Sequence, residues 1–132
     1  MSNVQFRGSC LCGECRYEVH GPLRPIVYCH CSQCRKQTGH FLAATNARLG
    51  DFKLLPSAPL RWYRASDTAQ RGFCGRCGSI LFWQADGSDS ISITAGTLDG
   101  KTGLVAEGHI YCADQGDYYA IPDEGYRLAQ WR

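Results

Sequence analysis

The length, composition and charge of the chain exclude several classes of protein. With 132 residues, of which 44% are hydrophobic and 20% charged, the sequence predicts one globular domain over residues 1–132 rather than a disordered or fibrous chain. The formal charge of +2 at pH 7 is no basic excess of the kind that neutralises phosphates, so no nucleic-acid partner is expected. The first residues lack the apolar run of a secretory signal and no stretch reaches membrane-spanning length, so we expect a cytoplasmic protein without a membrane partner.

Apolar and polar residues alternate in several short segments, which predicts β-strands along most of the chain. Residues 15–19 show this alternation, as on a half-buried strand. Further strands are expected at residues 26–28, 41–45, 60–63, 80–83 and 91–95. The helical candidate is one or two turns at 32–37, with Ser32 as the N-cap and Gly39 as the stop. The pattern predicts a mainly β fold with little helix.

Nine cysteines are the strongest chemical signal in the sequence. A disulfide framework usually has an even number of cysteines and a secretory signal, and neither is seen here. In a reducing cytosol, cysteines at this density are more often metal ligands or catalytic thiols. Most of them gather in three groups: Cys10-Leu-Cys12-Gly-Glu-Cys15, Cys29-His-Cys31-Ser-Gln-Cys34 and Cys74-Gly-Arg-Cys77.

The spacing within these groups indicates zinc. A C-x₂-C turn brings two sulfur atoms close enough to share one ion, and a structural zinc ion takes four ligands. The ligands of such a closed site would be Cys10, Cys12, Cys74 and Cys77. Three cysteines within six residues then remain, namely Cys29, Cys31 and Cys34. Three protein ligands with an open fourth position are the pattern of a catalytic zinc ion.

The spacing of Cys15 allows another interpretation, in which it is an eighth ligand and both zinc sites are closed, with no chemistry. The alternation of residues 15–19 favours instead a buried, inert thiol, since unliganded cysteine is among the most buried residue types. We therefore expect that Cys15 binds no metal ion. Cys112 is expected in a strand, with no partner cysteine nearby.

Two other cysteine chemistries fit the sequence less well. Cys74-Gly-Arg-Cys77 resembles a thioredoxin-type redox pair, but that motif needs a helix N-terminus in a βαβ setting, and a strand is predicted after it here. Cys12-Gly-Glu14 matches half of a zinc deaminase signature. Neither Cys31 nor Cys74 is preceded by the proline that the other half requires.

Taken in order, the motifs resemble those of the glutathione-dependent formaldehyde-activating enzyme family. The matching segments are Gly8-Ser-Cys-Leu-Cys-Gly13 with Tyr17, Tyr28-Cys-His-Cys-Ser-Gln-Cys-Arg-Lys-Gln-Thr-Gly39, Arg71-Gly-Phe-Cys-Gly-Arg-Cys-Gly-Ser79, Gly96-Thr-Leu-Asp99 and His109-Ile-Tyr111. They cover nearly the whole chain. The resemblance implies a small, sandwich-like fold of two sheets stapled by zinc, sometimes called a β-tent.

The resemblance also implies a division of labour between two zinc ions per chain. The structural zinc ligands would be Cys10, Cys12, Cys74 and Cys77, and the catalytic zinc ligands would be Cys29, Cys31 and Cys34. The implied activity is that of a carbon–sulfur lyase, which joins glutathione or another small thiol to formaldehyde to give S-hydroxymethylglutathione. An alternative function is a non-catalytic zinc module that binds a protein or nucleic-acid partner.

Four residues near the cysteine groups have open roles. His30 is either a proton shuttle or a hydrogen-bonded structural histidine. The three cations Arg35, Lys36 and Arg71 either bind the carboxylates of a glutathione-like ligand or form a solvated basic face. If seven cysteines bind two zinc ions as thiolates, the net charge becomes +2 − 7 + 4 = −1.

Overall fold

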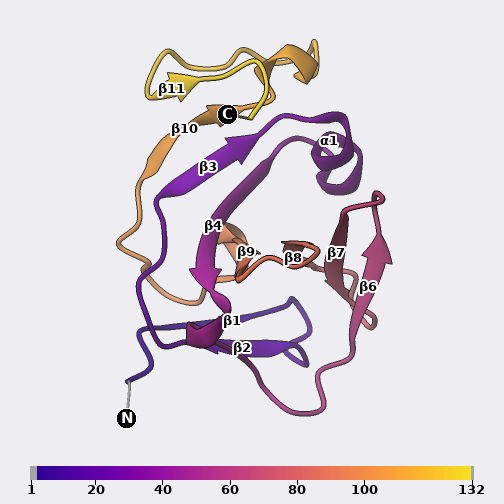
Figure 1. Ribbon diagram of the computed structural model, residues 1–132, viewed down its shortest axis with the longest axis vertical. Coiled ribbons are helices and arrows are strands. Elements are labelled where there is room, and N and C mark those ends of the chain that lie inside the picture. The colour runs from indigo at the N-terminus through magenta and orange to yellow at the C-terminus, as the bar shows by residue number, and fades with distance from the viewer. Residues whose placement is uncertain (1–2, 132) are drawn as a thin grey trace.

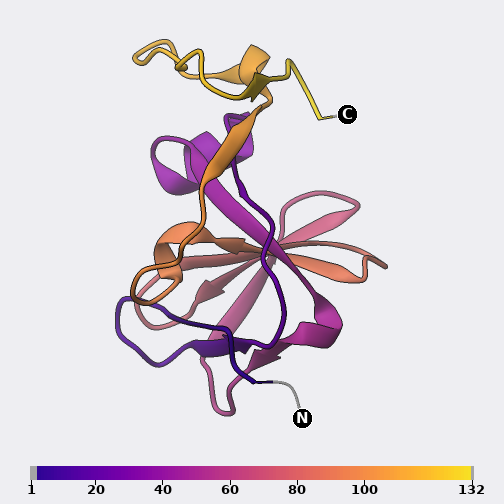
Figure 2. The same ribbon diagram turned by 90° about the vertical axis from the view of Figure 1, so that its left-hand side faces the viewer.

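Two β-sheets form the framework of the computed structural model, which describes residues 3–131 (Figures 1 and 2). The ends of the predicted domain, residues 1, 2 and 132, lie outside the described part. The small sheet holds β1 (Phe6–Ser9), β2 (Arg16–Val19) and β5 (Phe52–Leu54), in the order β1-β2-β5. All of its pairs are antiparallel.

The large sheet has eight strands. Their bounds are β3 Ile26–Cys29, β4 Leu42–Arg48, β6 Leu60–Arg64, β7 Ala69–Cys74, β8 Ile80–Ala85, β9 Ser90–Thr94, β10 Ala106–Ile110 and β11 Tyr126–Arg127. They are ordered β11-β10-β3-β4-β9-β8-β7-β6. Strand β10 runs parallel to both of its neighbours, β3 and β11, whereas the other pairs are antiparallel. This pairing places Ile110 opposite Cys29.

Helical structure is limited to one short α-helix and three 3₁₀ turns within residues 3–131. Helix α1 spans Ser32–Thr38 and follows β3 directly. The 3₁₀ turns are at Leu49–Asp51, Ala95–Thr97 and Cys112–Asp114. The predicted mainly β fold of two sheets with little helix is confirmed.

The main core lies where the small sheet packs against β8 and β9 of the large sheet. The Tyr17 ring is 1% exposed and meets the Phe82 ring edge to face, with centroids 5.3 Å apart. Gly8 lies directly opposite Tyr17 on β1, and a Cβ atom there would overlap the Tyr17 ring. The Tyr17 hydroxyl and the Thr97 hydroxyl are hydrogen-bonded at 2.8 Å. The core therefore fixes β1, and with it the cysteine loop that follows.

Candidate metal centres

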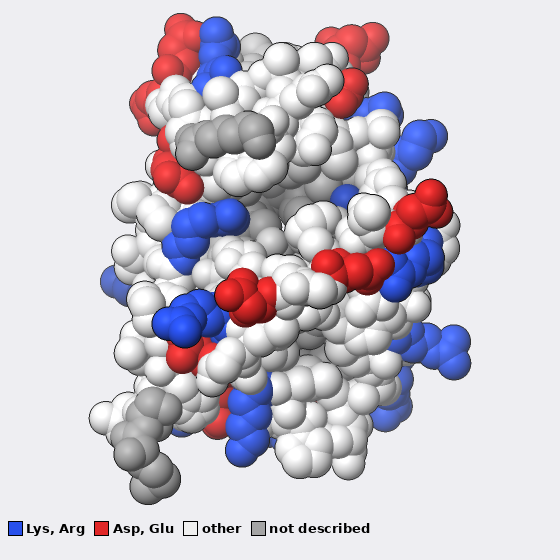
Figure 3. All heavy atoms as spheres, in the orientation of Figure 1, with Lys and Arg blue, Asp and Glu red and all other residues white. Residues whose placement is uncertain are grey.

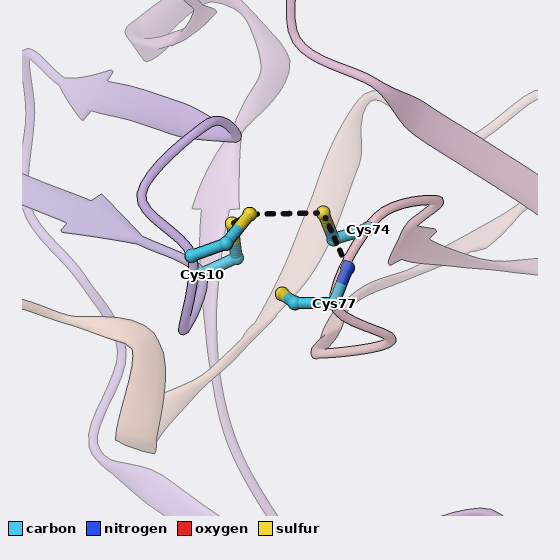
Figure 4. A group of neighbouring side chains, drawn as sticks. Cys10, Cys74 and Cys77 are labelled. Carbon is cyan, nitrogen blue, oxygen red and sulfur yellow. Dashed lines mark hydrogen bonds between the residues drawn. The ribbon is translucent and has the colours of Figure 1, made fainter.

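The structure brings four cysteines from two distant loops together. The loop after β1 carries Cys10 and Cys12, while Cys74 ends β7 and Cys77 lies in the turn before β8. Their sulfur atoms all lie within 4.8 Å of one another, and Figure 4 shows the side chains from the two loops pointing toward one another. The Cys12 sulfur is 3.6 Å from that of Cys10 and 3.8 Å from that of Cys74. We call these four residues the first cluster.

Backbone amides surround the sulfur atoms of the first cluster. The Cys15 N–H donates to the Cys10 sulfur at 3.2 Å, and the N–H groups of Arg76 and Cys77 both donate to the Cys74 sulfur at 3.4 Å. Such donors stabilise sulfur in its thiolate form, which is the form that binds a metal ion.

Glycine and serine complete the two loops of the first cluster. Gly13 and Gly78 have φ angles of 81° and 79°, in the left-handed region that favours glycine. The Ser79 hydroxyl accepts the N–H of Leu11 from the opposite loop at 2.9 Å and lies 3.2 Å from the Cys77 sulfur. Hydrogen bonds from Ser79 lower the pKa of Cys77 to about 5. Ser79 thus ties the loops together and favours a thiolate at Cys77.

Cys15 lies beside the first cluster but outside the set of mutually close sulfur atoms. Its side chain is fully buried, on the same face as Tyr17 and Val19. Burial, followed by contact with Cys74 and Cys10, raises the pKa of Cys15 to about 12. A neutral thiol in an apolar setting is therefore the form that this site favours.

The second cluster consists of Cys29, Cys31 and Cys34, whose sulfur atoms also lie within 4.8 Å of one another. Cys29 ends β3, Cys31 precedes α1, and Cys34 lies in the first turn of α1. The predicted N-cap, Ser32, is wrong. Cys31 caps the helix, because its extended backbone turns its sulfur toward the Cys34 N–H, which it accepts at 3.3 Å. Gly39 ends the helix with a φ of 86°, as predicted.

The second cluster offers three protein ligands. Within residues 3–131, no further cysteine, histidine or carboxylate joins the three sulfur atoms. Hydrogen bonds with Cys29 and Cys34 lower the pKa of Cys31 to about 2, whereas hydrogen bonds with Cys31 and Cys34, together with burial, raise the pKa of Cys29. One thiolate is thus favoured before any metal binds. Each cluster could hold a metal ion, the first with four sulfur ligands and the second with three.

His30 lies between two cysteines of the second cluster, and its ring is 1% exposed. Its Nδ1 is 2.7 Å from the Tyr119 hydroxyl, and its Nε2 is 2.9 Å from Nδ1 of His109 on β10. Burial, aided by the neighbouring His109, lowers the pKa of His30 to about 4. With both ring nitrogens engaged, His30 matches the interpretation of a hydrogen-bonded structural histidine.

Arg71 on β7 contacts the second cluster from a strand that is distant in sequence. Its side chain is only 5% exposed, and its Nη2 donates to the Cys34 sulfur at 3.5 Å. The other two nitrogens donate to Gln33 and Gln37 of α1. These contacts do not support the hypothesis that Arg71 binds a substrate carboxylate. Arg35 is half-buried and Lys36 is exposed, both in the last turn of α1.

Three residues around the second cluster were not found by sequence reasoning. Gln33 and Gln37 are four residues apart in a helix, a spacing that could have indicated a shared face. Tyr119 lies 89 residues from His30, and no local pattern marks it.

Charges on the face of the molecule shown in Figure 3 are mixed. Basic and acidic side chains are interspersed over most of it, and acidic groups gather at the top, over the C-terminal segment that carries Asp114, Asp117, Asp123 and Glu124. No continuous basic patch lies on this face. It therefore lacks the electrostatic footprint of a nucleic-acid-binding surface.

The family described as glutathione-dependent formaldehyde-activating enzyme matches residues 5–114. The chain belongs to this family. The matched range holds all seven cysteines of the two clusters and ends before Tyr119. Membership of the formaldehyde-activating family connects the chain with glutathione and formaldehyde, and the clusters add two possible metal centres.

A comparison with solved structures finds a protein of similar fold. A solved structure of a Rhodobacter sphaeroides protein is 27% identical, with a TM-score of 0.60, and the match covers 78% of this chain and 98% of that chain. No curated protein matches the chain. Within the described residues, no helix is both long and apolar enough to cross a membrane.

Proposed function

We propose that this member of the formaldehyde-activating family is a zinc-dependent, carbon–sulfur lyase-like enzyme. It would join a small thiol such as glutathione to formaldehyde and give S-hydroxymethylglutathione. The observation that carries the proposal is the difference between the clusters. The first offers four sulfur ligands and the second only three, with no fourth ligand among residues 3–131. A closed site stabilises a fold, whereas a site with an open position can bind a substrate.

The donor atoms fit zinc at both sites. Thiolate sulfur is the ligand type that selects Zn²⁺ over Mg²⁺ or Ca²⁺, and tetrahedral four-sulfur sites are typical of structural zinc. We therefore propose a structural zinc ion at Cys10, Cys12, Cys74 and Cys77 and a catalytic one at Cys29, Cys31 and Cys34. All nine cysteines are free thiols, which suits the cytoplasmic location that we propose.

The proposed reaction balances without an oxidant or a reductant. A carbon–sulfur bond forms, the carbonyl electron pair moves to oxygen, and that oxygen takes up a proton while the thiol loses one. A zinc ion at the second cluster would supply a positive centre that favours the thiolate form of the substrate. The chain's own part is to hold three sulfur atoms in place through the Cys34 N–H and the His30 contacts.

A metal count and an exchange measurement together test this function. Elemental analysis should find close to two zinc ions per chain. With glutathione and ¹³C-formaldehyde, exchange NMR should show the adduct forming about tenfold faster than without protein, or more. The variant Cys31→Ser should lose this acceleration, and the matched variant Cys112→Ser, outside both clusters, should keep it.

Two outcomes would contradict the proposal. A single tightly bound ion per chain would mean that the second cluster is not a zinc site. Full zinc occupancy without acceleration of glutathione, cysteine or 2-mercaptoethanol addition would favour the alternative function, a non-catalytic zinc module.

A further inference from the structure

Arg71 is a buried cation. Its side chain is 5% exposed, and no carboxylate oxygen of the described residues lies within 4.0 Å of it. A buried charge is costly unless an opposite charge or several hydrogen bonds compensate for it. The groups that surround the guanidinium therefore indicate which negative charge it compensates.

Among the hydrogen bonds that Arg71 makes within residues 3–131, the one to the Cys34 sulfur goes to a group that can carry a negative charge. Nε donates to the Gln33 Oε1 at 3.3 Å and Nη1 to the Gln37 Oε1 at 2.9 Å, and both acceptors belong to neutral amides. Nη2 donates to the Cys34 sulfur at 3.5 Å. The two amides lie four residues apart on α1 and hold the planar guanidinium in one orientation against the helix.

The contact between Arg71 and Cys34 is buried. Arg71 lines a hollow beneath α1 with a volume of about 10 Å³, roughly the space of one water molecule. The rest of the lining includes apolar side chains of β4, β8 and β9, among them Leu42, Phe82 and Ile93. Charges act on one another more strongly in such surroundings than in bulk water.

We propose that Arg71 is a positioning residue that stabilises the anionic form of the second cluster and thereby favours an anionic thiolate as the incoming ligand over a neutral one. This inference rests on the proposed function. Three thiolates and one Zn²⁺ carry −3 + 2 = −1, and Arg71 brings the sum to zero. A substrate thiolate adds a further negative charge, which the guanidinium stabilises, whereas a neutral ligand adds none.

The test compares a thiol with a neutral ligand on protein loaded with Co²⁺, whose thiolate absorption bands report ligand exchange. The variants are Arg71→Gln, which removes the charge, Arg71→Lys, which keeps it, and Arg61→Gln as a control on the exposed face of neighbouring β6. The probes are 2-mercaptoethanol, which binds as an anion, and imidazole, which binds as a neutral ligand.

Arg71→Gln should weaken metal binding at the second cluster by about 10- to 100-fold, the usual effect of losing a group that supports a metal ligand. It should also weaken 2-mercaptoethanol binding by about tenfold, and imidazole binding by less than about twofold. Arg71→Lys should restore most of the preference for the thiol, and Arg61→Gln should behave as the parent protein does.

An equal loss for both probes in Arg71→Gln would show a purely structural role and overturn the inference, as would no loss for either. If Arg71→Gln does not fold, the same measurement on Arg71→Lys tests the inference. Loss of the preference for 2-mercaptoethanol over imidazole in Arg71→Lys would then contradict it. A parent protein that binds only one Co²⁺ ion would overturn the proposed function itself. The metal count therefore distinguishes the two failures.

Discussion

Cys15 has the sequence spacing of a ligand and the surroundings of a core residue. Its group repeats the C-x-C-x₂-C pattern of the second cluster, yet its side chain is fully buried. Its backbone N–H donates to the Cys10 sulfur at 3.2 Å, and its carbonyl accepts the Cys10 N–H at 3.0 Å. The burial that raises the pKa of Cys15 opposes the thiolate form that a metal ligand needs.

Cys15→Ala should retain both metal ions and lower the free energy of unfolding by about 1 kcal/mol, the usual cost of removing one buried sulfur atom. Denaturant unfolding and elemental analysis measure the two effects. Cys10→Ala is the matched control, because it removes a predicted ligand of the first cluster and should lower the zinc content. A Cys15 sulfur found about 2.3 Å from a zinc ion would contradict the prediction.

His30 should remain neutral far into the acid range. Its pKa in the folded chain is about 4, below the ordinary value of 6.5. The unfolded chain therefore binds more protons between these values, so the contribution of His30 to stability is complete above pH 6.5 and is lost as the pH falls toward 4. NMR of the ring nitrogens should show no protonation of His30 between pH 8 and about 5.

The variant Tyr119→Phe serves as the control for the His30 titration. It removes the hydroxyl at Nδ1 but keeps an aromatic ring over the histidine, with which the Tyr119 ring is stacked. Because burial is the largest cause of the lowered pKa, the midpoint should stay low in this variant. A midpoint at or above pH 6.5 in the parent protein would contradict the prediction.

Helix α1 contributes to both the second cluster and the contacts of Arg71. Within seven residues it supplies Cys34 to the second cluster and two glutamine side chains to Arg71. Thr38 closes its last turn by donating to the Cys34 carbonyl at 2.7 Å. So short a helix is marginal in isolation, and its contacts with β7 therefore contribute to holding it in place.

Elements with a clear local pattern could be predicted from the sequence. The strands at β3, β4, β6, β8 and β9 follow from their apolar residues, and the end of α1 follows from Gly39. Strands β1, β5, β7, β10 and β11 were missed, since they are short or carry glycine and charged residues that weaken the pattern. Cys112 begins a 3₁₀ turn rather than lying in a strand. Strand β10 stops at Ile110, because the next residue, Tyr111, has a φ of 55°, outside the range of a strand.

The membership of the clusters could likewise be predicted, while their supporting contacts could not. Spacing and a count of four plus three separate the seven cysteines, and the structure groups them in the same way. The contact between Arg71 and Cys34 spans 37 residues, and that between His30 and Tyr119 spans 89. Contacts of this range depend on the packing of the sheets, which no local pattern encodes.

At the scale of the whole molecule, the two clusters should differ in their effect on stability. The first joins Cys12 to Cys74 across 62 residues, so a metal ion there holds distant parts of the fold together. Cys74→Ser should therefore lower the free energy of unfolding by about 3 kcal/mol or more, or the melting temperature by roughly 10 °C. Cys31→Ser should cost much less and remove thiol binding.

Thermal unfolding of the zinc-loaded variants, followed by circular dichroism, measures this difference. Cys112→Ser is the control, since it replaces a cysteine outside both clusters. Equal destabilisation by Cys74→Ser and Cys31→Ser would mean that the division into a structural and a catalytic site is wrong.

The compactness of the second cluster in the sequence also bears on biosynthesis. Its three cysteines are added to the growing chain within six residues of one another, when more than half of the chain is still to be made. The first cluster cannot be completed until Cys77 has been added, because synthesis proceeds from the N-terminus onward. The three ligands of the second cluster are therefore complete long before the four ligands of the first cluster can come together.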